Sequence, residues 1–331
     1  MSAADDARAA YDAKTKPRGS LGRLEELGVR LAGIRGSVPS SLEAAIVVAA
    51  ADHGVASEGV SAYPPEVTAQ MVLNFVAGGA AINVLAKQAG ARLVVVDAGV
   101  LTPVEAEGVR SLRIGAGTRS FTSGPAMSEE QARGGLEAGA ALVASLAPVD
   151  VVGLGEMGIG NTTSASAVTA ALVGVAPEEV CGRGTGVDDA GLARKVEAVR
   201  RGLAANPSRE PLAVLAGVGG FELAVLAGVV LGCARQRIAV LLDGFITTAA
   251  ALVAARMEPT AADVLIASHR SPEPGHALLL AELGQEPLLD LSLRLGEGTG
   301  AALALPLLRS SVAILAEMAT FADAGVTDAG R

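Results

Sequence analysis

Five short apolar runs recur along this chain, and each ends at or next to acidic or other polar residues. The runs are Ala45–Ala51, Leu93–Asp97, Val149–Leu154, Ile238–Leu242 and Val264–Ala267. Near-continuous apolar runs that alternate with helical segments are typical of parallel strands in a sheet covered on both faces. We therefore predict a three-layer α/β/α fold, with helices packed on both sides of a parallel sheet.

The polar residues at the ends of these runs indicate where a ligand would bind. They are Asp52-His53, Asp97, Glu156, Asp243 and Ser268-His269. The carboxyl ends of parallel strands meet at one edge of the sheet, and ligands of such folds bind just outside that edge. We therefore expect these side chains to surround a site.

Two helices are expected before the first strand. Residues 2–14 are rich in alanine with spaced charges, and Ser20 is placed to cap the second helix. An apolar stripe with helical spacing follows at Leu24, Leu27, Leu31 and Ile34. We predict that these helices form a separate helical piece that packs on the main body or on a second subunit. A last long helix is expected over Ala301–Ala322.

Charge and composition limit the partners and the compartment. The 331 residues carry a formal net charge of −9 at pH 7, which argues against nucleic acid or an anionic membrane as a partner. Cys181 and Cys233 are isolated, as expected for reduced, buried thiols. The amino-terminal residues have early acids and lack the apolar core of a signal peptide, and the uncharged run Met157–Pro177 is too polar to span a membrane. We expect a cytoplasmic protein that binds small molecules.

The stretch Val151–Ala167 (VVGLGEMGIGNTTSASA) has the pattern of a phosphate-binding loop, because glycines that open a helix present free backbone N–H groups. Gly153–Gly158 satisfies the dinucleotide fingerprint G-x-G-x-x-G, which makes an NAD-dependent oxidoreductase the alternative function. That fingerprint expects a second strand ending in an acid about 20 residues later, and none is evident. Gly155–Thr162 resembles a Walker A loop, but Asn161 stands where the lysine belongs. The pattern therefore predicts a phosphate cradle of neither standard type.

Three charged residues have both a functional and an ordinary interpretation. Glu297, between two glycines at a helix start, suits a helix-dipole partner and a general base equally. Lys195 lies on the helix after a second glycine loop, Gly182–Gly186. It is either a phosphate ligand or a solvated surface residue. Glu156 is either a functional acid or a solvated loop residue. The three histidines have no metal-binding spacing, and no nucleophile elbow occurs, so we expect chemistry without a metal or a cofactor.

Eight blocks of the sequence resemble one known family, the nicotinate-nucleotide:dimethylbenzimidazole phosphoribosyltransferases (CobT family). The resemblance runs in order over nearly the whole chain. The blocks are KPRGSLGRLEEL (16–27), ADHGVASEGVSAYPPEVTAQMVLNF (51–75), GEMGIGNTTSASA (155–167), GRGTGVDD (182–189), VLAGVGGFELAVLAG (214–228), LLDGF (241–245), ASHRSPEPG (267–275) and LRLGEGTGAALALPLL (293–308).

The resemblance implies a Rossmann-like parallel sheet with a small helical domain built from the chain's ends. Residues 1–40, with part of the carboxyl-terminal helix region, would form the small domain, and residues 41–331 the large one. It further implies a homodimer with sites near the subunit interface. The implied reaction is transfer of phosphoribose from nicotinate mononucleotide to 5,6-dimethylbenzimidazole, giving α-ribazole 5′-phosphate and nicotinate with inversion at C1′. No metal or redox cofactor is implied.

The resemblance also assigns roles to residues. Glu297 matches the general base of the family. Positions associated with the phosphoribosyl group are Gly158, Gly160, Asn161, Gly184, Lys195 and Ser271, and positions near the benzimidazole pocket are Gln70, Glu156 and Met157. The segment Ala62–Glu66 lies where the pocket varies within the family, so the preference among benzimidazoles, adenine and phenolic bases stays open.

Overall fold

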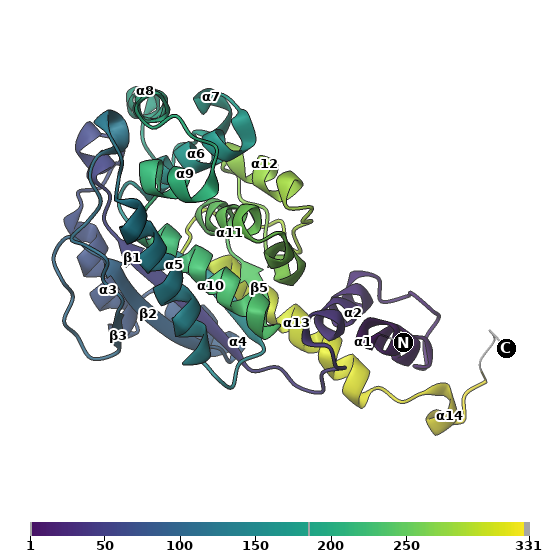
Figure 1. Ribbon diagram of the computed structural model, residues 1–331. Coiled ribbons are helices and arrows are strands. Elements are labelled where there is room, and N and C mark those ends of the chain that lie inside the picture. Colours follow the sequence, from purple (N-terminus) through teal and green to yellow (C-terminus); the bar gives the residue numbers. More distant parts are fainter. Residues whose placement is uncertain (1, 185, 328–331) are drawn as a thin grey trace.

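The computed structural model describes residues 2–184 and 186–327, and its centre is one six-stranded parallel sheet (Figure 1). The strands are β1 (Ala44–Ala51), β2 (Arg92–Gly99), β3 (Val109–Ser111), β4 (Val151–Met157), β5 (Ala239–Leu242) and β6 (Leu265–Ala267). All five predicted runs are confirmed as strands. The three residues of β3, which pair with β2 at the sheet edge, are too few to carry a periodic signal and were not predicted.

The order of the strands locates the functional edge. It is β3-β2-β1-β4-β5-β6, with every pair parallel. The chain builds outward in one direction from β1 and then in the other direction from β4, so the connections leave a crevice between the carboxyl ends of β1 and β4. This is the point at which doubly wound sheets bind their ligands.

Helices cover both faces of the sheet, as predicted. On one face, Ile46, Val48 and Ala50 of β1 belong to a cluster with α3 (Glu66–Ala77), α4 (Ala81–Ala89) and the start of α13 (Thr299–Glu317). The intervening residues of β1 belong to the cluster that includes α5 (Glu129–Ala144), α10 (Phe221–Gln236) and α11 (Phe245–Met257). Because successive side chains of a strand point to opposite faces, burial on both faces explains the unbroken apolar runs.

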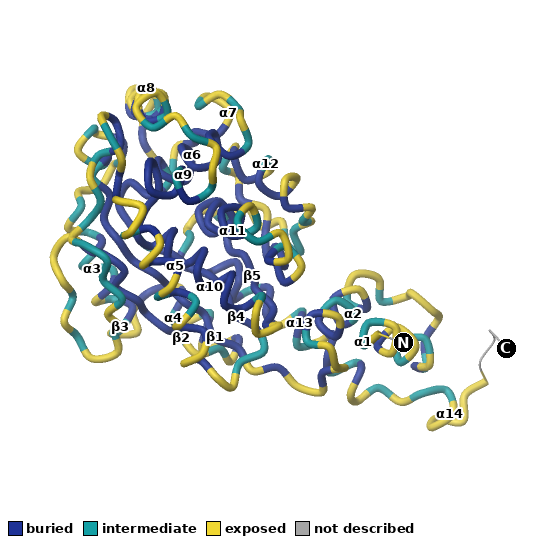
Figure 2. The backbone as a smooth tube through the Cα atoms, in the orientation of Figure 1, coloured by how far each residue is buried: buried dark blue, intermediate teal, exposed yellow. Residues whose placement is uncertain are grey.

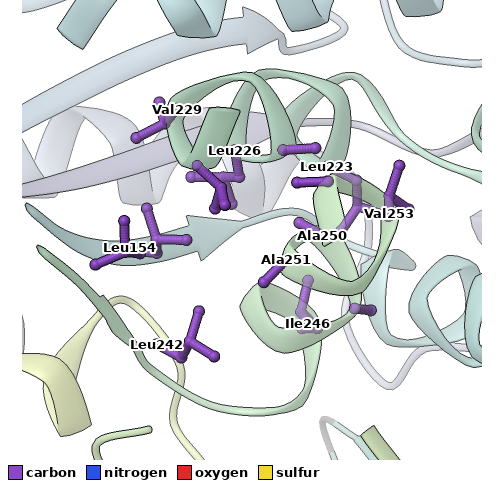
Figure 3. Close-up of a cluster of buried hydrophobic side chains, with 14 of the residues drawn as sticks. Leu154, Leu223, Leu226, Val229, Leu242, Ile246, Ala250, Ala251 and Val253 are labelled. Carbon is purple, nitrogen blue, oxygen red and sulfur yellow. The ribbon is translucent and has the colours of Figure 1, made fainter. Parts of the chain in front are cut away.

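The core between the sheet and α10–α11 is made of small and medium aliphatic side chains. Figure 3 shows Leu154 of β4 and Leu242 of β5 in one cluster with Leu223 and Leu226 of α10 and Ile246 of α11. These side chains are buried, as is most of the sheet and of both helices in Figure 2. The remaining helices of this part of the chain lie together at the top of Figure 1: α6 (Asn161–Thr169), α7 (Pro177–Val180), α8 (Asp189–Ala205), α9 (Pro211–Val218) and α12 (Pro274–Glu282).

The two ends of the chain pack against each other. α1 (Ala3–Asp12) and α2 (Arg23–Arg35) lie beside the carboxyl-terminal half of α13, away from most of the sheet (Figure 1). Tyr11 is buried there, and its hydroxyl donates a hydrogen bond to the Ser311 carbonyl oxygen at 2.7 Å. The predicted helical unit built from the chain's ends is therefore present. Its boundary at residue 40 remains a proposal.

Two predicted helix ends are wrong. The prediction that Ser20 caps the second helix fails, because α2 begins at Arg23 with Gly22 as N-cap. Ser20 instead lies in a turn, with its amide bonded to the Pro17 carbonyl oxygen. The last long helix ends at Glu317 rather than at Ala322, and a short helix, α14 (Phe321–Ala324), follows it.

Two segments are apolar and long enough to cross a membrane by composition alone, residues 66–89 and Thr299–Glu317. The first is not one helix, because α3 and α4 are separated at Gly78–Ala80. Phe75 of α3 and Leu308 of α13 are fully buried in the core. Both segments therefore serve as covering helices of the sheet.

Gly155→Ala tests how closely the chain packs on β4. A Cβ at this position would lie 2.5 Å from the carbonyl oxygen of Glu297 and 2.8 Å from the Gly298 nitrogen, both of them backbone atoms. We expect the free energy of unfolding to fall by about 1–3 kcal/mol, as for an overpacked core site, and activity to fall with it. Urea denaturation measures the change. Gly134→Ala on the exposed side of α5 is the control: nothing lies within 4 Å of its Cβ, so it should be neutral or slightly stabilising. Equal effects of the two substitutions would contradict the account.

Candidate active site

A cavity of about 520 Å³ lies at the predicted edge of the sheet, at the carboxyl end of β4. Most of the residues predicted for the site line it, and they come from segments far apart in the chain. These lining residues are Glu156, Met157, Gly158, Asn161, Gly184, Ser271 and Glu297. The fold therefore brings three glycine loops and the segment after β6 to one place.

The first glycine loop is shorter than the sequence pattern indicated. Gly153, Gly155 and Glu156 are residues of β4, so the loop proper is Gly158–Gly160. Gly160 has φ +97° and is the N-cap of α6. The amide of Ile159 donates to the Thr68 hydroxyl at 3.1 Å, which ties the loop to α3. The loop opens the amino end of α6 toward the cavity, the arrangement that favours a phosphate.

The second glycine loop lies against Lys195. The surface interpretation of this lysine is wrong: the side chain is 1% exposed. Its ammonium group donates to the Thr162 hydroxyl at 2.9 Å and to the Gly182 carbonyl oxygen at 3.1 Å. Burial lowers the pKa of Lys195. A lysine ammonium has three donors, so one remains for an anion. Gly184 has φ +49°, and a Cβ there would lie 2.9 Å from the Lys195 nitrogen.

The third glycine loop holds Glu297 in a rare backbone conformation. Gly296, Glu297 and Gly298 have φ values of +81°, +63° and +87°. A left-handed non-glycine residue is uncommon and is found preferentially at functional sites. Asp243 stabilises the loop, since its carboxylate accepts from Gly298 N at 3.1 Å and from Gly300 N at 2.6 Å. Glu297 Oε2 is buried and has no hydrogen-bond partner in residues 2–184 and 186–327.

Glu156 lies beside this loop. A Cβ added to Gly296 would be 2.2 Å from Glu156 Oε1, and Asn161 donates its side-chain amide to Glu156 Oε2. Glu156 is 6% exposed, so the solvated interpretation is wrong. Burial, together with the charges of Asp243 and Glu222, raises the pKa of Glu156 to about 8. Burial also raises the pKa of Glu297, with a smaller contribution from the charge of Asp243.

Three predicted residues lie outside the cavity lining. Gly160 and Lys195 lie behind it, in the two glycine-loop structures just described. Gln70 is exposed on α3, and its helix neighbours Val67 and Met71 line the cavity instead. The sequence does not show which of Val67, Gln70 and Met71 faces the cavity, because all three lie on the same helix, α3.

Several lining residues were not predicted. They are Tyr63, Val67, Met71, Ile159, Thr162, Gly244, Phe245, Ile246, Glu273, Arg294, Leu295 and Gly296. Apolar residues carry no chemical motif, so only the fold identifies them. His269, which follows β6, lines the cavity as the polar end of that run predicted. Over the chain apart from residues 1, 185 and 328–331, no group of three His, Cys, Asp or Glu residues could hold a metal ion.

Comparison with known proteins identifies the family. A family model described as a phosphoribosyltransferase matches residues 1–326. The chain is 54% identical to the nicotinate-nucleotide–dimethylbenzimidazole phosphoribosyltransferase of Desulforudis audaxviator, with 98% of this chain and 93% of that one aligned. It belongs to this phosphoribosyltransferase family. The protein of the same name from Geobacter metallireducens is 52% identical, with 97% and 92% aligned. The crystal structure of CobT from Thermus thermophilus superposes with a TM-score of 0.94 at 49% identity, covering 98% of this chain and 99% of that one.

Membership of the phosphoribosyltransferase family makes this protein an enzyme of the pentosyltransferase class. The predicted family resemblance and the α/β fold are confirmed. The geometry also weakens the oxidoreductase alternative. A dinucleotide fingerprint places its glycines in the turn after the strand, whereas Gly153 and Gly155 lie within β4.

Glu156→Gln tests the electrostatics of the cavity. A carboxyl group whose pKa is raised on folding, here to about 8 from an ordinary value of 4.5, destabilises the folded state increasingly as pH rises between those two values. Glutamine keeps an oxygen for Asn161 and removes the charge. We expect the variant to be more stable than the wild type by on the order of 1–3 kcal/mol at pH 8 and equal to it near pH 4. Urea denaturation at several pH values measures this, with exposed Glu137→Gln on α5 as the control. A difference that does not grow with pH would contradict the assignment.

Proposed function

We propose that this enzyme transfers phosphoribose from nicotinate mononucleotide to 5,6-dimethylbenzimidazole, giving α-ribazole 5′-phosphate and nicotinate. The reaction belongs to the assembly of the cobalamin nucleotide loop. The observation that carries the proposal is the buried Glu297 carboxylate, which lines the same cavity as the phosphate cradle and has one oxygen without a hydrogen-bond partner among the residues that the structure describes. The names of the relatives support the choice of substrates.

The phosphoribosyl group would bind between the first two glycine loops. Lys195 supplies one positive charge, and the amino end of α6 supplies backbone donors. Gly158, Gly160 and Gly184 allow the main chain to approach the sugar phosphate, while Asn161 and Ser271 offer polar side chains. Local donors are required because the net charge of −9 repels an anion.

The benzimidazole would lie on the apolar wall of the cavity. Met157, Val67, Met71 and Ile246 provide surface for a flat ring, and Glu156 and Glu297 provide carboxylates at its edge. Gln70 stays a proposed contact of the base.

The reaction follows from this arrangement. Glu297 accepts the proton from one ring nitrogen while the other ring nitrogen attacks C1′ of the ribose. The bond from C1′ to the pyridinium nitrogen breaks, and its electron pair stays on nicotinate, which leaves as a neutral pyridine ring. A single displacement inverts C1′ from β to α. The transition state carries positive charge at C1′, and buried carboxylates close to it stabilise that charge. Each step uses only side chains of this protein.

We further propose a cytoplasmic homodimer with the cavity mouth near the subunit interface. Tyr63 and Leu295 line the cavity and are more than half exposed, and Leu291, in the same segment of the chain as Leu295, is also exposed. Exposed apolar groups around a ligand site are often covered by a partner. The small helical domain would comprise residues 1–40 with the end of α13, and residues 41–331 would form the rest.

The activity is tested directly by incubating the purified protein with nicotinate mononucleotide and dimethylbenzimidazole, without added metal. We expect α-ribazole 5′-phosphate and nicotinate in equal amounts. Absence of product would contradict the proposal, and tight binding of NAD in a titration would favour the oxidoreductase alternative.

Glu297→Gln removes the proton acceptor and keeps the shape of the side chain. We expect kcat to fall by about 10²–10⁴-fold, while KM for nicotinate mononucleotide changes only a few-fold. Steady-state kinetics measure both constants. A near-normal kcat would show that another group takes the proton.

Lys195→Met removes the buried cation and preserves the length of the side chain. We expect KM for nicotinate mononucleotide to rise by about tenfold or more, the equivalent of one lost charge-assisted hydrogen bond. Lys87→Met on the exposed side of α4 is the matched control. If the two variants had the same KM, Lys195 would not bind the phosphate.

A further inference from the structure

A buried histidine lies directly beneath the first glycine loop, outside the cavity lining. His53 follows β1, and its side chain is inaccessible to solvent. Its Nδ1 lies 3.0 Å from the Ser164 hydroxyl of α6, and its Nε2 lies 2.8 Å from Glu222 Oε1 of α10. Both partners are also inaccessible. The imidazole therefore joins β1, α6 and α10 at the switch point of the sheet.

The hydrogen bonds orient the imidazole. The Ser164 hydroxyl donates its one hydrogen to the Gly219 carbonyl oxygen at 3.1 Å, so it accepts from His53 Nδ1–H. The other ring nitrogen, Nε2, then faces Glu222 Oε1 at 2.8 Å in a fully buried pair. His53 is therefore placed to offset part of the negative charge of Glu222.

The imidazole also supports the loop sterically. A Cβ on Gly158 would lie 3.4 Å from the ring, and one on Gly160 would lie 3.2 Å from His53 Cβ. Ser164 belongs to the first turn of the helix that the loop opens. The loop consequently rests on His53 and is linked to it through α6.

The charge of Glu222 acts on Glu156, a residue that lines the cavity. Glu156 faces Asp243 after β5, Glu222 of α10 and Glu297 of the third loop, and all three charges act on its pKa in the raising direction. Glu222 faces His53 on one side and acts on Asp52 on another. His53 is thus the basic group in direct contact with Glu222.

We propose that His53 is a positioning residue: it holds the Gly158–Gly160 loop, and through its direct contact with Glu222 it offsets part of the negative charge of that carboxylate beneath Glu156. The inference rests on the proposed function, because it concerns how the same site is kept ready for substrate.

Three variants of the full-length enzyme separate these roles. His53→Asn keeps a donor near Ser164 and leaves Glu222 without its partner. His53→Asn combined with Glu222→Gln removes the uncompensated charge. Ser164→Ala breaks the link to α6 and leaves the charges unchanged. The measurement is kcat/KM against pH with nicotinate mononucleotide and dimethylbenzimidazole.

In the plot of kcat/KM against pH, the acidic limb is the part where activity rises with pH. We expect His53→Asn to shift this limb to higher pH by about one unit, since an added like charge raises the pKa of the coupled Glu156 and Glu297 carboxylates. The double variant should move the limb back toward its wild-type position. Ser164→Ala should raise KM for nicotinate mononucleotide several-fold without moving the limb. An unmoved limb in His53→Asn, or no return in the double variant, would overturn the proposal.

Glu222→Gln alone covers the case in which His53→Asn does not fold. The charge of Glu222 contributes to the raised pKa of Glu156, and His53 offsets part of that charge, so this variant should shift the acidic limb to lower pH by clearly less than about one pH unit. A downward shift of about one pH unit or more would show that His53 does not offset the charge and would overturn the proposal. Urea midpoints without substrate provide a test independent of activity. The midpoint of His53→Asn should fall more steeply than that of the wild type as pH rises from 5 to 8, and the double variant should return toward the wild-type slope. If the wild type forms no α-ribazole phosphate, the proposed function fails, but this stability comparison still decides the role of His53.

Discussion

The close packing of the Glu297 loop against β4 is the contact on which the site depends. Three consecutive left-handed residues, Gly296 to Gly298, bring backbone atoms of Glu297 against Gly155, where no Cβ fits. Asp243 at the end of β5 binds the amides at the start of α13 and holds the loop in place. Backbone strain of this kind persists only where the surroundings enforce it. The sheet edge therefore fixes the position of the carboxylate that would carry out the chemistry.

The same edge concentrates buried acids around a substrate that is itself partly anionic. Burial raises the pKa of Glu156 to about 8 and that of Asp243 to about 7, so both hold protons more readily than exposed acids do. The amino end of α6 is next to Glu156, through the Asn161 side chain, and Lys195 lies against the second glycine loop, where the phosphate would bind. Donors for the phosphate and acids near C1′ suit a reaction in which positive charge develops at C1′ while the phosphate stays negative. The buried acids lower the stability of the fold, and this loss is the cost of the activity that they support.

The sequence predicts much of this architecture because strands buried on both faces are continuous apolar runs. β1 and β2 are examples. Of the polar residues predicted at the strand ends, Glu156 and His269 line the cavity, whereas Asp52, His53, Asp97, Asp243 and Ser268 do not. Other elements have no such signal. α11 is buried along most of its length, so its sequence lacks an amphipathic pattern, and β3 has only three residues. Gly155 looked like a loop residue, because a glycine that makes room for another segment is indistinguishable in sequence from one that makes a turn.

For the site, the family resemblance indicated what each residue does, and the structure showed how deeply each is buried and what it contacts. The interpretations of Lys195 and Glu156 as solvated residues could be rejected only once their burial was known. The position of Gln70, exposed beside two lining residues, likewise depends on how α3 is rotated against the sheet. The His53–Glu222 pair joins residues 169 positions apart and has no local signal.

The most direct test of the central claim is a crystal structure of this enzyme with both substrates, or with a benzimidazole and a non-reacting analogue of nicotinate mononucleotide. Three carboxylates line the cavity, Glu156, Glu273 and Glu297. The account predicts a Glu297 oxygen within hydrogen-bond distance of a ring nitrogen, about 2.6–3.2 Å, with the other ring nitrogen facing C1′. A complex in which Glu156 makes that contact and Glu297 faces away would contradict it.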